Sequence, residues 1–326
     1  MDSSPHARLS RALDSLEGLS VGDAFGEQFF MSFELVARLL DKSDQWDGPP
    51  YDFEDDFVHR ELIVTRRLEF CATTWKWTDD TALALEVVAE LRDNGKIVPG
   101  SLAQRFGRRY MHEPNRAYGA AMHSLLPRLE REGWQNAAQN LFDGKGSYGN
   151  GSAMRVPPLG AYFADDFDLL VEQARLSAIV THSHQEAIAG AIATAVAAGI
   201  SARLKHEGIE ISRRDFLSEI IARTPESEVK DWLRQSHDFP EDYTSEQVSC
   251  IVGSGMDVAC QDTVPFCCWC AASQSTNFSE AMWLTVAGLG DRDTTCAIVG
   301  GIVGARVGIK GVPTPWLARR EPLVWL

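Results

Sequence analysis

Three glycines recur at every fourth position near the end of the sequence, at Gly300, Gly304 and Gly308. Because residues four apart share one face of an α-helix, these glycines would form a smooth stripe without side chains. Such a stripe lets a second helix approach very closely. We expect this contact to press the start of the glycine-striped helix against the helix start at Thr78. In a membrane the pattern suggests dimerising helices, but the longest apolar run, residues 296–305, is too short to span a bilayer.

Two acidic clusters are the strongest chemical signal in the chain. Each combines carboxylates with hydroxyls and leads directly into an apolar, helix-like stretch. Their sequences are Trp77-Thr78-Asp79-Asp80-Thr81 and Gly290-Asp291-Arg292-Asp293-Thr294-Thr295. One such cluster alone would be interpreted as a helix cap, because Thr and Asp satisfy free amides and the helix dipole. Two clusters favour a shared site for a pair of hard divalent cations, which prefer oxygen ligands.

The composition restricts the classes of partner. The chain has 326 residues, 44% of them hydrophobic, and a formal net charge of -15. The acidity argues against a general affinity for nucleic acid or for an anionic membrane. The seven cysteines lack zinc-finger spacing, and the first ten residues lack the apolar core of a signal peptide. We therefore expect a cytoplasmic protein with reduced thiols.

Apolar spacing predicts a chain made mostly of helices. The expected helices cover residues 9–22, 78–94, 101–111, 117–132, 167–180, 185–204, 228–236, 245–256, 278–287 and 294–307. The first should stop at Gly18 or Gly22, and the Pro157-Pro158 pair should prevent a helix immediately after it. We favour one all-α domain over residues 1–326, with surface insertions near 41–56 and 223–245. A mixed α/β chain, with a strand at 61–64, is the alternative.

Residues 144–155 hold four glycines and are expected to form an exposed turn. The backbone amides of such a loop can cradle phosphate oxygens, although the lysine of a Walker loop is missing. An ordinary turn is the alternative for this segment. The nearby His182 starts an alanine-rich helix, where it could simply make a structural hydrogen bond.

Taken together, these pieces resemble the ADP-ribosylglycohydrolase family, which includes the dinitrogenase-reductase-activating glycohydrolases. Four motifs in the same order carry the resemblance, and Thr181-His182 is a weaker fifth. They are Gly22-Asp23-Ala24-Phe25-Gly26, Trp77-Thr78-Asp79-Asp80-Thr81, Gly149-Asn150-Gly151-Ser152-Ala153-Met154-Arg155 and Gly290-Asp291-Arg292-Asp293-Thr294. The ordered set spans most of the chain and is highly specific.

The resemblance implies an orthogonal helical bundle with two Mg²⁺ or Mn²⁺ ions in a cleft. The implied metal ligands are Thr78, Asp79, Asp80, Asp291, Asp293 and Thr294. The implied ADP-ribose site comprises Gly146, Ser147, Tyr148, Gly149, Asn150 and His182. Many members carry a glutamate seven residues after the aspartate of the first motif, where this chain has Phe30. Glu27 is the candidate for that role.

The resemblance implies a metal-dependent hydrolase that removes ADP-ribose from a modified protein side chain, most often arginine. Asp79, Asp80 and Asp291 would hold a water and accept protons, with Glu27 as a further catalytic candidate. Two alternatives remain open. One is a non-catalytic binding or immunity protein that blocks an ADP-ribosyltransferase toxin by contact, and the other is a structural descendant of the family.

Overall fold

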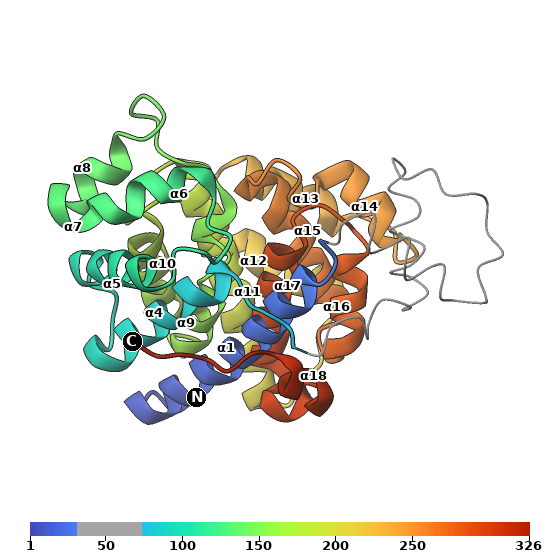
Figure 1. Cartoon of the computed structure of the whole chain (residues 1–326). Helices are drawn as coiled ribbons and strands as arrows, with labels where there is room; N and C mark the ends of the chain where they lie inside the picture. Colours follow the sequence, from blue (N-terminus) through green and yellow to red (C-terminus); the bar gives the residue numbers. More distant parts are fainter. Residues whose placement is uncertain (31–73) are drawn as a thin grey trace, which may run out of the picture.

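Figure 1 shows the computed structural model of the chain, which describes residues 1–30 and 74–326. Within these ranges the regular elements are helices, and β-type pairing is limited to isolated bridges. The predicted all-α class is confirmed. The insertion expected at 41–56 and the strand expected at 61–64 lie outside the described residues.

The helices are α1 (Pro5–Glu27), α4 (Asp79–Asn94), α5 (Pro99–His112), α6 (Ala120–Leu125), α7 (Leu129–Glu132), α8 (Trp134–Gln139), α9 (Pro157–Tyr162), α10 (Phe167–Ala178), α11 (Gln185–Glu207), α12 (Arg213–Arg223), α13 (Glu228–His237), α14 (Ser245–Val252), α15 (Cys260–Ser273), α16 (Phe278–Val286), α17 (Arg292–Val307) and α18 (Thr314–Arg319). Short 3₁₀ turns occur at Leu126–Arg128, Asn150–Ser152 and Ile309–Gly311.

The most intimate helix pair is α1 with α17, which lie side by side in Figure 1. A Cβ atom on Gly18, Gly22 or Gly26 of α1 would strike a backbone carbonyl oxygen of α17. In return, a Cβ on Gly304 would come within 2.9 Å of the Cα of Gly18. Both helices have glycine at the positions of contact, and this is what lets the two backbones touch.

This pairing corrects two expectations. Helix α1 continues through Gly18 and Gly22 to Glu27, because its glycines are contact residues inside a helix and not stop signals. The stripe on α17 packs against α1, whereas we expected it to meet the helix that begins after Thr78. Gly308 takes no part in the stripe: it lies beyond the last turn of α17 with φ +68°.

Helix α11 is a core helix that packs against α9, α10, α12, α15 and α17. It is long and apolar enough to cross a membrane by length and composition alone, but 89% of its apolar window is buried inside the fold. Its alanine side chains are small, so α9 can approach its backbone closely. A Cβ on Gly160 of α9 would strike the carbonyl oxygen of Ala195. A helix that is apolar on all sides is typical of a protein core.

Three other sequence expectations need correction. Helix α9 begins at Pro157, because a proline in the first helical turn gives up no hydrogen bond. The segment 223–245 contributes α13, whose Val229 and Leu233 are fully buried and which packs against α15, so this part is not a surface insertion. Helix α15 itself was not expected, since Pro265 interrupts its pattern.

Candidate metal centre and ligand cavity

The first acidic cluster is fixed where helices α1 and α4 meet. Thr78 caps α4, and Asp79 and Asp80 open its first turn. The buried carboxylate of Asp23, on α1, accepts hydrogen bonds from the backbone amides of Thr78 and Thr81 and from both their hydroxyls. Asp23 thus anchors the start of α4 to α1.

The second acidic cluster arrives from the start of α17. Asp291 occupies the N-cap position, and Asp293 and Thr294 follow in the first turn. The hydroxyl of Thr294 donates to Asp80 Oδ2 over 3.5 Å. A carboxylate oxygen of Asp23, one of Asp80 and one of Asp293 all lie within 4.8 Å of one another. The fold therefore brings the two clusters together, and the backbone contact between Gly26 and the start of α17 explains why.

The concentration of buried carboxylates strongly perturbs their ionisation. Burial, reinforced by neighbouring carboxylates, raises the pKa of Asp79 and of Asp80 well above the usual range. Burial also raises the pKa of Asp23 and Asp291 to about 7 and that of Asp293 to about 6. None of these five groups forms an ion pair with a lysine or arginine among the described residues. The cluster therefore needs protons or bound cations to offset its charge.

The hydrogen-bond pattern separates two kinds of carboxylate. Asp80 Oδ1 is buried without a partner in the described structure, and an unsatisfied buried oxygen is costly. It fits a cation ligand. Asp23, by contrast, has both oxygens occupied by Thr78 and Thr81 and fits a supporting role. Among the predicted ligands, Asp80 and Asp293 therefore have oxygens close enough to share a cation, while Asp79, Asp291 and Thr294 line the adjoining cavity and Thr78 caps α4. Carboxylate and hydroxyl oxygens of this kind suit Mg²⁺ or Mn²⁺.

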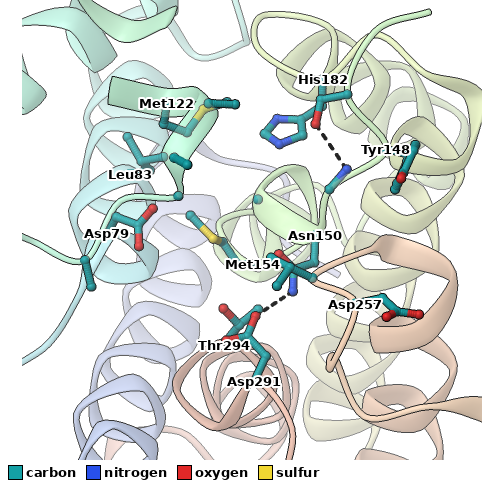
Figure 2. A pocket seen from close by; sticks show the side chains of 18 of the residues that line it. Asp79, Leu83, Met122, Tyr148, Asn150, Met154, His182, Asp257, Asp291 and Thr294 are labelled. Atoms are coloured by element: carbon teal, nitrogen blue, oxygen red, sulfur yellow. Dashed lines mark hydrogen bonds between the residues drawn. The ribbon is translucent and has the colours of Figure 1, made fainter. Parts of the chain in front are cut away.

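A cavity of about 450 Å³ opens beside this cluster (Figure 2). Its acidic part is lined by Asp79, Asp291, Asp293 and Thr294, and the remainder includes Ser147, Tyr148, Gly149, Asn150, Gly151 and His182. Figure 2 shows the His182 side chain across the cavity from Asp291. Apolar side chains, among them Leu83, Met122 and Met154, complete the wall. The cavity thus combines an acidic end with a glycine-rich end.

The glycine-rich loop is clamped to the segment that precedes α15. The amide of Asn150 donates to Val258 O over 3.1 Å, and the amide of Cys260 donates to Tyr148 O over 3.0 Å. A Cβ on Gly151 would lie 2.9 Å from His182 Cε1, so only glycine fits there without displacing the imidazole. We expected an exposed turn over residues 144–155, but most residues from 150 onward are buried because of these contacts.

Some candidate residues lie outside the cavity wall. Gly146 has φ +74° and packs against Ser183, so it shapes the loop without lining the cavity. Thr78 and Asp80 are buried behind the acidic end. Glu27 is also outside the lining, at the end of α1, but burial and the nearby charge of Asp291 raise the pKa of its carboxyl.

Asp23 is the functional residue to which the sequence analysis gave no role. A usable signal existed, since Asp23 stands between Gly22 and Gly26 in a helix whose neighbouring positions are apolar. A carboxylate on a buried helix must find partners, and here it finds the start of α4.

Comparisons with known proteins identify the family of the chain. A sequence profile described as ADP-ribosylglycohydrolase matches residues 4–326. A protein named ADP-ribosylhydrolase ARH3 from Xenopus tropicalis is 28% identical, over 97% of this chain and 92% of that protein. One named ADP-ribosylarginine hydrolase Tri1 from Pseudomonas putida (strain GB-1) is 25% identical, over 98% of this chain and 76% of that protein.

Among solved structures, an ADP-ribosylglycohydrolase-related protein complex superposes with a TM-score of 0.60. The match covers 95% of this chain and 92% of that one at 24% identity, so the likeness concerns the fold. The profile, by contrast, spans nearly the whole sequence and includes both acidic clusters and the glycine-rich loop. The chain is therefore a member of the ADP-ribosylglycohydrolase family.

Proposed function

We propose that this protein is a divalent-metal-dependent hydrolase that removes ADP-ribose from modified protein side chains, with arginine as the preferred linkage. Two Mg²⁺ or Mn²⁺ ions would be held by Thr78, Asp79, Asp80, Asp291, Asp293 and Thr294. Membership of the family supports the hydrolysis of ADP-ribose conjugates. The metal dependence and the linkage are our additions.

The observation that carries the metal dependence is the buried acidic cluster without a described cationic partner. Asp80 is 1% exposed, and one of its oxygens has no hydrogen-bond partner. Two further carboxylates, those of Asp23 and Asp293, lie close to it. Like charges at this separation are unstable in a low-dielectric interior unless a cation or a proton offsets them. A divalent-cation site accounts for all these features together.

The chain's own groups account for the steps around the reacting centre. Bound cations would supply Lewis acidity toward ribose hydroxyls and water. Asp79 and Asp291 both line the cavity, so either carboxylate can accept the proton of a water that attacks the anomeric carbon. Glu27, whose pKa is raised, is a further proton acceptor at the edge of the cluster. As the bond from the anomeric carbon to the side-chain nitrogen breaks, the proton taken from the water passes to the departing nitrogen and the hydroxide adds to the anomeric carbon. The surrounding negative charge stabilises the oxocarbenium-like transition state.

The opposite end of the cavity suits the rest of ADP-ribose. Ser147, Tyr148, Gly149 and Asn150 come from one loop, and His182 faces that loop. The small loop residues allow phosphate oxygens to approach the backbone closely. The loop and the acidic end are joined by a hydrogen bond from Asn150 Nδ2 to Asp291 Oδ2 of 2.7 Å. One ligand could therefore span both ends.

The arginine linkage is supported by the name of the Pseudomonas putida relative, an ADP-ribosylarginine hydrolase. We also propose a cytoplasmic location. The described cysteines are free thiols, and those of α15 are buried in the core, which suits a reducing compartment.

The decisive experiment measures release of free ADP-ribose from arginine-modified and serine-modified proteins, with Mg²⁺, with Mn²⁺ and with a chelator. The parent protein should act in the presence of metal and prefer the arginine conjugate. Asp291→Asn and Asp79→Asn should each slow release by on the order of a hundredfold or more, because each removes a charged group next to the reacting bond.

Asp242→Asn is a matched control, since Asp242 is exposed and does not line the cavity. It should leave release unchanged. Full activity in both Asp291→Asn and Asp79→Asn would show that the active site lies elsewhere. If both variants lost hydrolysis but still blocked an ADP-ribosyltransferase as well as the parent does, the protein would have a contact-based function as well.

A further inference from the structure

A fully buried arginine stands behind the cavity wall. Arg155 has no exposed surface, and its guanidinium lies over the ring of Phe106, 4.5 Å from the ring centroid. One nitrogen, Nη2, donates to Ser177 O and to Thr181 Oγ1, each over 2.9 Å. Nε and Nη1 have no partner in the described structure. Burying a cation with so few hydrogen-bond partners is costly. Thr181 is the only side chain to which Arg155 donates a hydrogen bond in the described structure.

Thr181 links this arginine to the cavity. Its hydroxyl lies 2.7 Å from Nδ1 of His182, and His182 lines the cavity with 4% of its surface exposed. The far side of the imidazole faces the glycine-rich loop, where a Cβ on Gly149 would lie 3.3 Å from Nε2. Within the described ranges, no group hydrogen-bonds to Nε2. Three side chains therefore form a line from the core to the cavity.

The direction of the hydrogen bond between Arg155 and Thr181 follows from which group can donate. A guanidinium has donors and no acceptor, so the Thr181 oxygen must accept from Arg155. The single hydroxyl proton is then free to point at His182 Nδ1, and the adjacent positive charge makes the hydroxyl a better donor. With Nδ1 accepting, the ring proton resides on Nε2. Burial and the charge of Arg155 also lower the pKa of His182 to about 3, which keeps the ring neutral.

We propose that Thr181, oriented by Arg155, is a positioning residue that fixes His182 as the Nε2–H tautomer, so that a single N–H donor faces the cavity. The acceptor would be an oxygen of the ADP-ribose group; this part of the inference rests on the proposed function. Neither Arg155 nor Thr181 lines the cavity, so both act through His182. The arrangement pre-orients the donor before the ligand binds and reduces the ordering cost of binding.

The first test reads the tautomer directly in the unmodified protein. In metal-loaded protein labelled with ¹⁵N-histidine, long-range proton–nitrogen correlation distinguishes a protonated ring nitrogen from an unprotonated one. The His182 signals are assigned by their loss in His182→Gln. We expect Nε2–H at pH 7 without ADP-ribose. An Nδ1–H ring or an imidazolium would overturn the proposal, and this reading needs no variant of Thr181 to fold.

The second test compares Thr181→Val with Thr181→Ser. Valine keeps the branched shape and removes the hydroxyl, whereas serine keeps the hydroxyl. By calorimetry, Thr181→Val should bind ADP-ribose about tenfold more weakly, a change typical of one misdirected hydrogen bond, and should show mixed tautomers. Thr181→Ser should match the parent protein in both measurements. Parent-like affinity with Nε2–H retained in Thr181→Val would overturn the proposal.

The two tests also separate this proposal from the proposed function. If the parent protein showed the Nε2–H ring but no affinity for ADP-ribose, the ligand assignment would fail while the positioning role of Thr181 would stand. If it bound ADP-ribose through an Nδ1–H ring, the ligand assignment would stand and the positioning role would fail.

Discussion

The side chain of Asn150 donates to Asp291 Oδ2 over 2.7 Å and so connects the glycine-rich loop to the start of α17. The same nitrogen also donates to Thr263 Oγ1 over 3.2 Å. Asn150 thus holds one carboxylate of the acidic cluster in a fixed orientation. Any ligand that moves the loop must also act on this carboxylate.

Loss of this contact should weaken metal binding. In Asn150→Ala, Asp291 loses its hydrogen-bonded orientation, and we expect the Mg²⁺ concentration for half-maximal ADP-ribose release to rise about tenfold, since supporting partners typically contribute a factor of this size or more. The measurement is a metal titration of activity. Asn140→Ala, at an exposed position, provides the control and should titrate like the parent protein. An unchanged midpoint in Asn150→Ala would rule out the orienting role.

A methyl group on the glycine-rich loop should impair ligand binding without unfolding the protein. The Cβ of Gly151→Ala would lie 2.9 Å from His182 Cε1, so the imidazole must shift. We expect more than about a tenfold loss of ADP-ribose affinity by calorimetry, because the shift disturbs a preorganised site. Gly119→Ala is a useful comparison, since Gly119 lines the same cavity but has nothing within 4 Å of its added Cβ. Equal losses in both variants would contradict the specific role of His182.

The acidic cluster predicts an unusual dependence of stability on pH. The pKa of Asp23 and of Asp291 is about 7 in the folded protein, against an ordinary value of 3.8. Between pH 4 and 7 the folded state therefore binds more protons than the unfolded state. Stability must fall as pH rises through this window.

We expect the metal-free protein, measured in chelator, to have a lower melting temperature at pH 8 than at pH 5.5. Added Mg²⁺ should stabilise it most at pH 8, where protons no longer compete for the carboxylates. Asp291→Asn removes one of the titrating groups and should reduce the pH dependence, whereas Asp242→Asn at the surface should not. A melting temperature that rose with pH in chelator would be incompatible with this account.

The sequence was sufficient for the helical class and for the acidic residues that lie in or beside the cavity wall. Asp79, Asp80, Asp291 and Asp293 could be found because their side chains indicate their chemistry whatever the fold. The local signals were less reliable where distant contacts override them. Gly18 and Gly22 look like helix stops, yet they lie inside α1 because α17 packs directly against them.

Other features depended entirely on tertiary structure. Asp23 has a visible charge but no local partner, since Thr78 and Thr81 reach it only after α4 packs against α1. The link from Arg155 to the Thr181-His182 pair joins two segments of chain that carry no shared sequence signal. Helix α15, which was not among the expected helices, contains Pro265, and a proline inside a sequence pattern normally argues against a helix.

The contact between α1 and α17 allows a further test. In Gly22→Ala the new Cβ would strike the carbonyl oxygen of Cys296, so the two helices must separate. We expect the free energy of unfolding to fall by about 1–3 kcal/mol, the usual range for overpacking, together with weaker metal binding. Urea unfolding and metal titration would measure the two effects.

The control is Gly100→Ala in α5, where the nearest atom to the new Cβ is Trp134 Nε1 at 4.0 Å. Alanine should be neutral there or should stabilise the helix by about 0.5–1 kcal/mol. If Gly22→Ala were as stable as Gly100→Ala, the close helix contact would not be needed for the fold.

The glycine contact also determines how the centre can respond to ions of different size. Asp293 and Asp23, which anchors the start of α4, stand on two helices whose backbones already touch, so these helices cannot move closer together. In the proposed metal site, adjustment between Mg²⁺ and a larger ion would therefore come from rotation of carboxylate side chains. Selectivity among metals would then depend on side-chain torsion on a rigid frame.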